Sequence, residues 1–223
     1  DAPEAYGLGY AVTTSTPFSR ALMCMDQMMV DRKVDPIYVT ATPIPDYTEN
    51  RGAAGYGARE MLLSAISRMT EQSAAVRYVA FDRSTPDIVA LHSGHPSKAE
   101  LRVPDFFVRG AVTQINTSPF SKQSGWSATV AASGETFQGG STGISGSMSL
   151  ATVSLDLSIG LIKNYQMLPG VSSSNSFSVV KTGDSTELSL SFEKVGAVLR
   201  SSENESKALS DGLRALIELG AIE

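Results

Sequence analysis

The sequence is poor in the residues that mark the commonest functional classes of proteins. Its single cysteine, Cys24, excludes a disulfide within the chain and leaves the cellular compartment open. Charged residues make up only 18% of the chain, and a net charge of −5 without a basic cluster argues against a nucleic-acid surface. No apolar run approaches the ~18 residues of a spanning helix, so membrane insertion would have to use strands. The sequence opens at Asp1 without a signal peptide, which fits a cytosolic protein or a processed chain equally well.

Motifs that carry chemistry are also missing. His92 and His95 form an H-x-x-H pair without a third ligand nearby, so we expect loop histidines rather than a metal site. The stretch "RGAAGYG" lacks the Lys-Ser/Thr ending of a phosphate-binding loop, and "GLGYAV" follows no strand that would give it a dinucleotide-binding context. We therefore predict no catalytic residue, no cofactor and no metal.

What the sequence does contain is an α/β pattern at both ends. Helical spacing of apolar residues predicts helices over about 17–32 and 58–71, while "IYVTATPI", "RYVAFD" and "DFFVRGAVTQI" predict strands. A weaker helix is expected near 86–92. The stripe of Leu209, Leu213, Leu216 and Ile217 predicts a final helix that must cover a sheet. We assign an arm and helix to 1–35, the first part of an α/β domain with a mixed sheet and flanking helices to 36–116, and its last helix to 200–223.

The middle of the chain, by contrast, is rich in Ser and Gly and patterned as strands. A hairpin over 171–199, turning at Thr182-Gly183, would place Phe177 opposite Leu188 and Val179 opposite Thr186. This register divides the ribbon into two faces. The apolar face comprises Phe177, Val179, Leu188, Leu190 and Phe192. The polar face comprises Ser176, Ser178, Glu187, Ser189, Ser191 and Glu193.

A second hairpin is predicted over 117–150, with Trp126 at its base. The strand and loop of 151–170 would then return the chain to the α/β domain. Between Leu150 and Val153 the apolar residues change from even to odd positions, which predicts a bulge near Ala151-Thr152. Both hairpins are interpreted as insertions into the α/β domain.

Two environments fit such amphipathic hairpins. Arms of about ten residues with one apolar and one small polar face match the ~9–11 residues of a transmembrane barrel strand, and Trp126 would suit a membrane interface. The same alternation describes an antiparallel sheet that packs one face on a soluble core, and the pattern alone favours this second environment. Four strands cannot close a barrel, so the membrane interpretation requires a ring of several subunits.

The order of segments resembles that of the curli secretion channel (CsgG) family. The resemblance spans about residues 37–223 and is carried by "IYVTATPIPDYTEN…AREMLLSAISRM", "RYVAFDR", "PDFFVRGAVTQIN", "ATVSLDLSIGLI" and the closing "ALSDGLRALIELGAIE". It implies an outer-membrane lipoprotein with a periplasmic domain that assembles into a ring of about nine copies. In that family each subunit gives two hairpins to a shared oligomeric β-barrel. The apolar ribbon face and Trp126 would then contact lipid, and the polar face would line the pore.

Two departures qualify what the resemblance implies. The family's lipidated cysteine is not at position 1, and Cys24 lies on the apolar side of a predicted helix, where we expect a core residue. The family's constriction loop is shorter here, where only Tyr47, Asn50, Arg51 and Tyr56 could face a channel, so we expect a wide or absent constriction. The leading hypothesis is a passive outer-membrane channel or collar subunit that contacts other secretion or appendage proteins. The first alternative is a soluble periplasmic ring or adaptor docking on such a partner, and a small α/β enzyme is the third.

Overall fold

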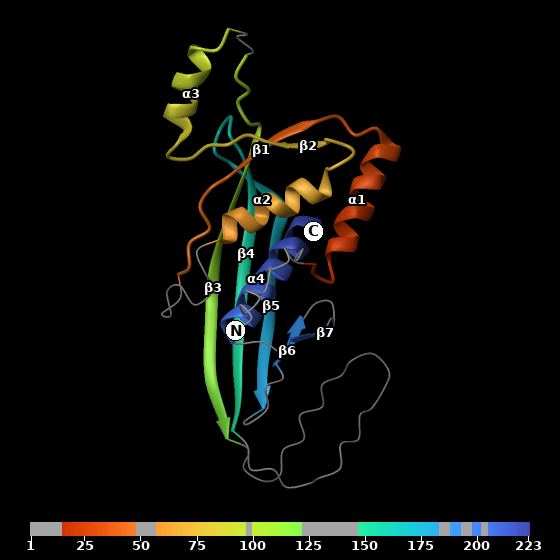
Figure 1. Ribbon diagram of the computed structural model, residues 1–223, viewed down its shortest axis with the longest axis vertical. Helices are drawn as coiled ribbons and strands as arrows, with labels where there is room; N and C mark the ends of the chain where they lie inside the picture. The colour runs from red at the N-terminus through yellow and green to blue at the C-terminus, as the bar shows by residue number, and fades with distance from the viewer. Residues whose placement is uncertain are drawn as a thin grey trace, which may run out of the picture.

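The computed structural model describes residues 15–47, 57–96, 100–121, 147–182, 188–192, 198–201 and 205–223 (Figure 1). The helices are α1 (Ser19–Arg32), α2 (Ala58–Met69), α3 (Thr85–Ser93) and α4 (Glu205–Ile222). The strands are β1 (Ile37–Ala41), β2 (Val76–Tyr78), β3 (Phe106–Ser121), β4 (Ser147–Leu161), β5 (Met167–Thr182), β6 (Leu188–Phe192) and β7 (Val198–Ser201).

All seven described strands belong to one mixed sheet in the order β2-β1-β3-β4-β5-β6-β7. Strand β1 pairs in parallel with β2 and β3, as expected for strands separated by a helical crossover, and every later pair is antiparallel. The predicted α/β architecture with a mixed sheet and flanking helices is therefore confirmed. Figure 1 shows β3, β4 and β5 as long strands that extend below the helices.

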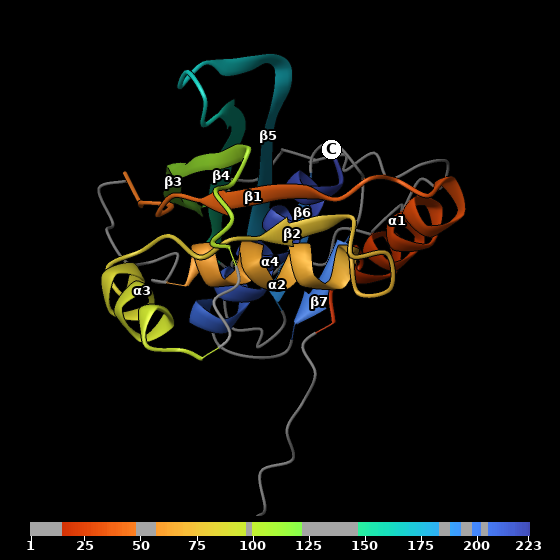
Figure 2. The same cartoon turned by 90° about the horizontal axis from the view of Figure 1, so that it is seen from above.

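The core lies between this sheet and the helices α1, α2 and α4, which the view from above places together on one side of the sheet (Figure 2). The predicted stripe of α4 is buried throughout, with Leu213, Leu216 and Ile217 fully enclosed. Leu22 is the fully buried residue of α1, and Leu62 and Ile66 fill the same role in α2. Helical periodicity thus identified the inward faces of these three helices. Cys24 of α1 is an exception, because it was expected in the core and is exposed.

The register of the predicted second hairpin is wrong, although its division into faces is right. Phe177 pairs with Phe192 and Val179 with Leu190, so the partner of each β5 residue lies four positions further along the chain than predicted. The shift is even, which keeps the same residues on the same face. It brings the Phe177 and Phe192 rings to a centroid distance of 5.8 Å. A buried aromatic pair stabilises this register more than the weak Thr-Gly turn signal could stabilise the other.

The predicted bulge is also misplaced. Strand β4 pairs regularly with β3 at Ala151 and Thr152, and the irregularity lies across from it, between Val112 and Gln114 of β3. A second one lies between Ser158 and Gly160, where β4 meets β5. An extra residue in β3 does not alter the alternation of side chains along β4, so the change of parity between Leu150 and Val153 did not mark a bulge in β4.

Candidate functional site

The apolar ribbon face that was predicted to contact lipid lies in the core of the subunit itself. Phe177, Val179, Leu190 and Phe192 are each exposed by 2% or less. Helix α4 covers them so closely that a Cβ added at Gly212 would overlap two ring carbons of Phe177 and lie 2.9 Å from Cδ2. Phe18, at the start of α1, packs edge-on against Phe192 with ring centroids 5.5 Å apart.

This burial corrects the membrane-facing assignment for those four residues, because a helix of the same chain occupies the side where lipid was expected. Leu188 belongs to β6, but its side chain lies outside the described part, and so does Trp126. The alternation in the sequence reported correctly that one face is buried. It carried no information about what covers that face.

The hydroxyl-rich face lies on the opposite side of the sheet and is half-buried. Ser176 and Ser178 of β5 and Ser191 of β6 alternate with the buried residues, and the Ser178 hydroxyl is 3.2 Å from that of Thr152 on β4. Ser178 also pairs with Ser191 across the strands. The side chain of Ser189 and residues Glu187 and Glu193 fall outside the description. That these hydroxyls line a pore stays a prediction.

The candidate constriction loop begins at the side of the sheet. Tyr47 is 70% exposed, and its N–H donates to the carbonyl of Val112 on β3 at 3.0 Å. Asn50, Arg51 and Tyr56 lie outside the described residues. The expected histidine pair sits on and just after α3, and no cluster of three or more metal-ligating side chains occurs among the described residues.

Helix α3 and the residues near it expose an apolar surface that was not predicted from the sequence. Helix α3 has no buried residue, and Figure 1 shows it apart from the sheet and the other helices. We call residues 81–95 and 101–103 the α3 lobe. Its exposed apolar side chains are Phe81 at 69%, Ile88 at 50%, Val89 at 42%, Leu91 at 76%, Leu101 at 52% and Val103 at 72%.

A polar anchor fixes the position of this lobe. The Asp82 carboxylate accepts hydrogen bonds from the N–H of Ser84 at 2.8 Å and its hydroxyl at 2.5 Å. The same carboxylate accepts from Arg59 Nη2 of α2 at 3.0 Å, while Thr85 Oγ1 accepts from the Asp82 N–H at 2.8 Å. The Ser84 hydroxyl and N–H, together with Arg59, lower the pKa of Asp82 to about 2. The anchor therefore remains ionised across the physiological range.

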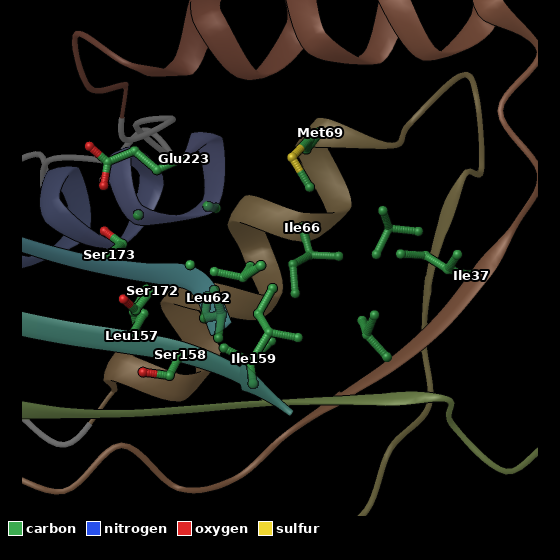
Figure 3. Close-up of a pocket in the computed structure, with 17 residues that line it drawn as sticks. Ile37, Leu62, Ile66, Met69, Leu157, Ser158, Ile159, Ser172, Ser173 and Glu223 are labelled. Atoms are coloured by element: carbon green, nitrogen blue, oxygen red, sulfur yellow. The ribbon is translucent and has the colours of Figure 1, made fainter. Parts of the chain in front are cut away.

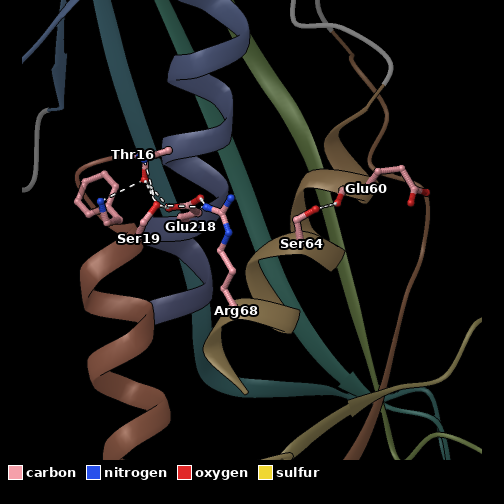
Figure 4. A network of polar contacts seen from close by, with 7 residues as sticks. Thr16, Ser19, Glu60, Ser64, Arg68 and Glu218 are labelled. Atoms are coloured by element: carbon pink, nitrogen blue, oxygen red, sulfur yellow. Dashed lines mark hydrogen bonds and ion pairs between the residues drawn. The ribbon is translucent and has the colours of Figure 1, made fainter. Parts of the chain in front are cut away.

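A buried polar network joins the three covering helices. Figure 4 shows Arg68 reaching from α2 to Glu218 of α4, where Nη1 and Oε1 are 3.1 Å apart. Glu218 is 2% exposed, and its other oxygen accepts from the hydroxyls of Thr16 and Ser19 at the start of α1. These partners of the Glu218 carboxylate lie on α2 and at the start of α1, so we assign the network to the packing of the helices rather than to catalysis or ligand binding.

A similar contact secures α1 to the turn after α2. Buried Asp26 accepts from the backbone N–H groups of Gln72 and Ser73 at 2.8 and 2.9 Å. Burial raises the pKa of this carboxyl, but the hydrogen bonds from Ser73 and Gln72 outweigh burial and leave the pKa below its ordinary value.

An apolar groove of about 260 Å³ opens between α2, the C-terminal end of α4 and the sheet (Figure 3). Ile37, Leu62, Ile66 and Ile159 point into it from strands and helix alike, and Glu223, Ser172 and Ser173 lie toward its α4 side. Ile37 and Val171 remain 40% and 39% exposed on its walls. The groove and the α3 lobe thus both leave apolar side chains uncovered.

None of the described helices is both long enough and apolar enough to cross a bilayer. No protein-family model matches the chain, and no curated protein matches it. Among solved structures, lipoprotein GNA1162 from Neisseria meningitidis is 15% identical, with a TM-score of 0.31 over 66% of this chain and 84% of that one. Hypothetical protein CT253 from Chlamydia trachomatis is 12% identical, with a TM-score of 0.33 over 65% and 73%. Protein XCC0632 from Xanthomonas campestris, of family DUF330, is 14% identical, with a TM-score of 0.31 over 84% and 80%.

Proposed function

We propose that this chain is a non-enzymatic assembly subunit of the Gram-negative cell envelope. In this proposal, several copies form a ring-shaped periplasmic collar or adaptor that docks on another component of a secretion or surface-appendage system. The resemblance to the curli secretion channel family supplies the setting. The α3 lobe supplies the physical reason for assembly.

The proposal rests on helix α3, which has no buried residue although several of its side chains are apolar. An isolated helix of nine residues is marginal in water, so most helices in proteins depend on packing of one face. Here no residue of α3 is buried, and the large apolar side chains of its lobe face solvent, while α1, α2 and α4 each bury one apolar face in the core. Several exposed apolar side chains gathered on one short helix, such as Ile88, Val89 and Leu91, are typical of protein–protein contact sites. The hydrogen bonds of Asp82 with Arg59, Ser84 and Thr85 keep the start of the lobe in place for such a contact.

Burial of the Phe177 ribbon favours the adaptor over the channel. An apolar face already covered by α4 has no free surface to offer lipid, and uncovering it would expose four fully buried side chains. This burial is the reason we prefer the adaptor, since the channel hypothesis relied on this hairpin as one of two.

The outer-membrane channel remains a second candidate because of the length of two strands. β3 has 16 residues and β4 has 15, and both exceed the ~9–11 that a tilted strand needs to cross a bilayer. If this hairpin spans the membrane, its lipid-facing residues lie within 117–150 rather than on the Phe177 ribbon. Recovery from membranes only with detergent would favour this candidate.

The adaptor proposal is tested by assembly of the purified chain with Leu91→Asp. Met23→Asp is the matched control, because Met23 is 53% exposed on α1 and receives the same charge. Light scattering coupled to size exclusion should show a multimer for the unmodified chain and for Met23→Asp. It should show at least a tenfold weaker association for Leu91→Asp, since a charge would be buried at the contact. Equal assembly of all three chains, or only monomers throughout, would contradict the proposal.

A further inference from the structure

The groove of Figure 3 and the α3 lobe are two different apolar surfaces on one chain. Figure 3 shows Leu62, Ile66 and Ile159 converging on the space of the groove, and the partly exposed Ile37 and Val171 belong to its walls. The lobe, by contrast, stands out from the sheet and the other helices (Figure 1). A projecting apolar surface and a hollow one can cover each other when they meet.

The α3 helix carries a pair of anchors that suits the groove. Ile88 and Leu91 are three positions apart, so their side chains lie on the same face of the helix, where they are 50% and 76% exposed. Together the two side chains fill roughly 240 Å³ at ~30 Å³ for each carbon-sized group. The groove has a volume of about 260 Å³. A helix bound in an apolar groove uses anchors with this spacing.

The exposed apolar area of the lobe matches what a stable contact needs. Its large apolar side chains, from Phe81 to Val103, are between 42% and 76% exposed. They leave on the order of 400 Å² of apolar surface uncovered. A standard interface takes about 800 Å² from each partner, and a little over half of this, roughly 450 Å², is apolar. The lobe therefore supplies about the apolar area of one side of such an interface.

The lobe is held away from the groove of its own copy. Arg59, in the first turn of α2, bonds to Asp82 at the start of the lobe, whereas Met69, the last residue of α2, lines the groove. Ile37, the first residue of β1, lines the groove as well. Figure 2 shows α3 and the start of β1 at opposite ends of α2. The two surfaces can therefore meet only between different copies.

We propose that the α3 lobe of one copy docks in the groove of the next copy, with Ile88 and Leu91 as the side chains that enter it. The inference rests on the proposed assembly function and names the surface that the lobe contacts. Because the contact joins two different patches, it is heterologous, and its repetition closes a ring when the rotation between copies permits closure. A contact of lobe against lobe would be isologous and would end at a dimer.

Two variants, each changed in one surface, test this pairing by complementation. Leu91→Asp alters the lobe and leaves the groove intact, while Val171→Asp alters the groove wall and leaves the lobe intact. Either charge would be buried at the contact, so each variant alone should associate at least tenfold more weakly than the unmodified chain. An equimolar mixture retains one intact lobe and one intact groove. Analytical ultracentrifugation should therefore show one-to-one heterodimers that associate at least tenfold more tightly than either variant alone.

Met167→Asp is the matched control for the groove variant. Met167 lies on the same strand as Val171 and is 41% exposed against 39%, but it lies outside the groove lining. This control should assemble as the unmodified chain does, and weakening equal to that of Val171→Asp would overturn the inference.

The outcomes separate this inference from the assembly function on which it rests. Normal assembly of Val171→Asp beside weakened Leu91→Asp would overturn the groove contact and leave the assembly proposal standing. Normal assembly of Leu91→Asp would overturn both. A mixture that associates no more tightly than the separate variants would overturn the groove contact alone.

Disulfide trapping tests the same contact with smaller changes, so that a fold weakened by Val171→Asp does not decide the result. The exposed Cys24 is first replaced by Ser in both chains. Leu91→Cys and Val171→Cys chains of different mass are then mixed and mildly oxidised. The mixed disulfide should form at least tenfold faster than either homodimer. Faster formation of the Leu91→Cys homodimer would identify a contact of lobe against lobe, and equal rates would show no specific pairing; both results would overturn the inference.

Discussion

Replacing Gly212 by Ala should destabilise this protein, against the usual effect of that change in a helix. Ala is about 1 kcal/mol better than Gly in a helix interior, so an unhindered site would gain that amount. At Gly212 the new methyl group would overlap Cε2 and Cζ of Phe177 and lie 2.9 Å from Cδ2. The ring cannot retreat easily, since it is 1% exposed and packs against Phe192 at 5.8 Å.

The magnitude follows from two opposing effects. Overpacking of a well-packed core costs about 1–3 kcal/mol, and the helix preference offsets about 1 kcal/mol of this. Because three ring carbons of Phe177 lie within 2.9 Å of the added methyl group, we take the upper half of that range, about 2–3 kcal/mol, and expect a net loss of about 1–2 kcal/mol in the free energy of unfolding. For a chain of this size, that corresponds to a melting temperature lower by about 2–8 °C.

Urea unfolding followed by circular dichroism measures this loss, and two controls make it specific. Gly94→Ala places a methyl group in ordinary contact with the Leu91 carbonyl at 3.6 Å and should change stability by less than about 0.5 kcal/mol. Combining Gly212→Ala with Phe177→Leu should cost less than the sum of the single changes, because the smaller side chain leaves room for the methyl group. If Gly212→Ala instead stabilises the protein by about 1 kcal/mol, the ribbon does not pack on α4.

Two further predictions concern the buried carboxylates. Asp26→Asn should lower the free energy of unfolding by about 1–3 kcal/mol at neutral pH, since its hydrogen bonds are to an ionised group. The folded pKa of Asp26 lies below the unfolded value of 3.8, so this contribution is present above about pH 4 and is lost as pH falls through the folded pKa. Unfolding measured from pH 7 to pH 3 should therefore show the difference between the two chains shrinking, and a constant difference would refute this linkage. Glu218→Gln removes the carboxylate charge 3.1 Å from Arg68, and because the Arg68 side chain is 30% exposed we expect a loss of about 1–3 kcal/mol, smaller than for a fully buried pair. Calorimetry of this variant should show a lower melting temperature, and an unchanged value would mean that the pair contributes nothing to stability.

Much of the fold could be predicted because it depends on local periodicity. The spacing of Leu213, Leu216 and Ile217 identified the buried face of α4, and alternation assigned Phe177 and Phe192 to one face of their ribbon. What covers that face could not be predicted. Pairing of a strand with a helix depends on contacts between distant segments, and an alternating strand looks the same beneath a helix and beneath lipid.

The candidate site was harder to predict for the same reason. Ile88 and Leu91 are residue types usually found in a core, so nothing in their identity indicated that α3 stands apart from the sheet. The Glu218 network joins residues separated by about 200 positions, and a lone glutamate within "LIELGAIE" carries no signal of its partners. Short-range sequence patterns predict well which residues are buried, but they predict poorly which distant residues those side chains contact.

The place of α4 in the chain has a consequence for biogenesis. Every strand that this helix covers precedes it in the order of synthesis. While the polypeptide is still emerging from the ribosome or a translocon, α4 has not yet been made. The sheet therefore exposes the apolar side chains that α4 later covers, namely Phe177, Val179, Leu190 and Phe192. A holdase that retains the protein at this stage would need to recognise that transient surface and release it when α4 docks.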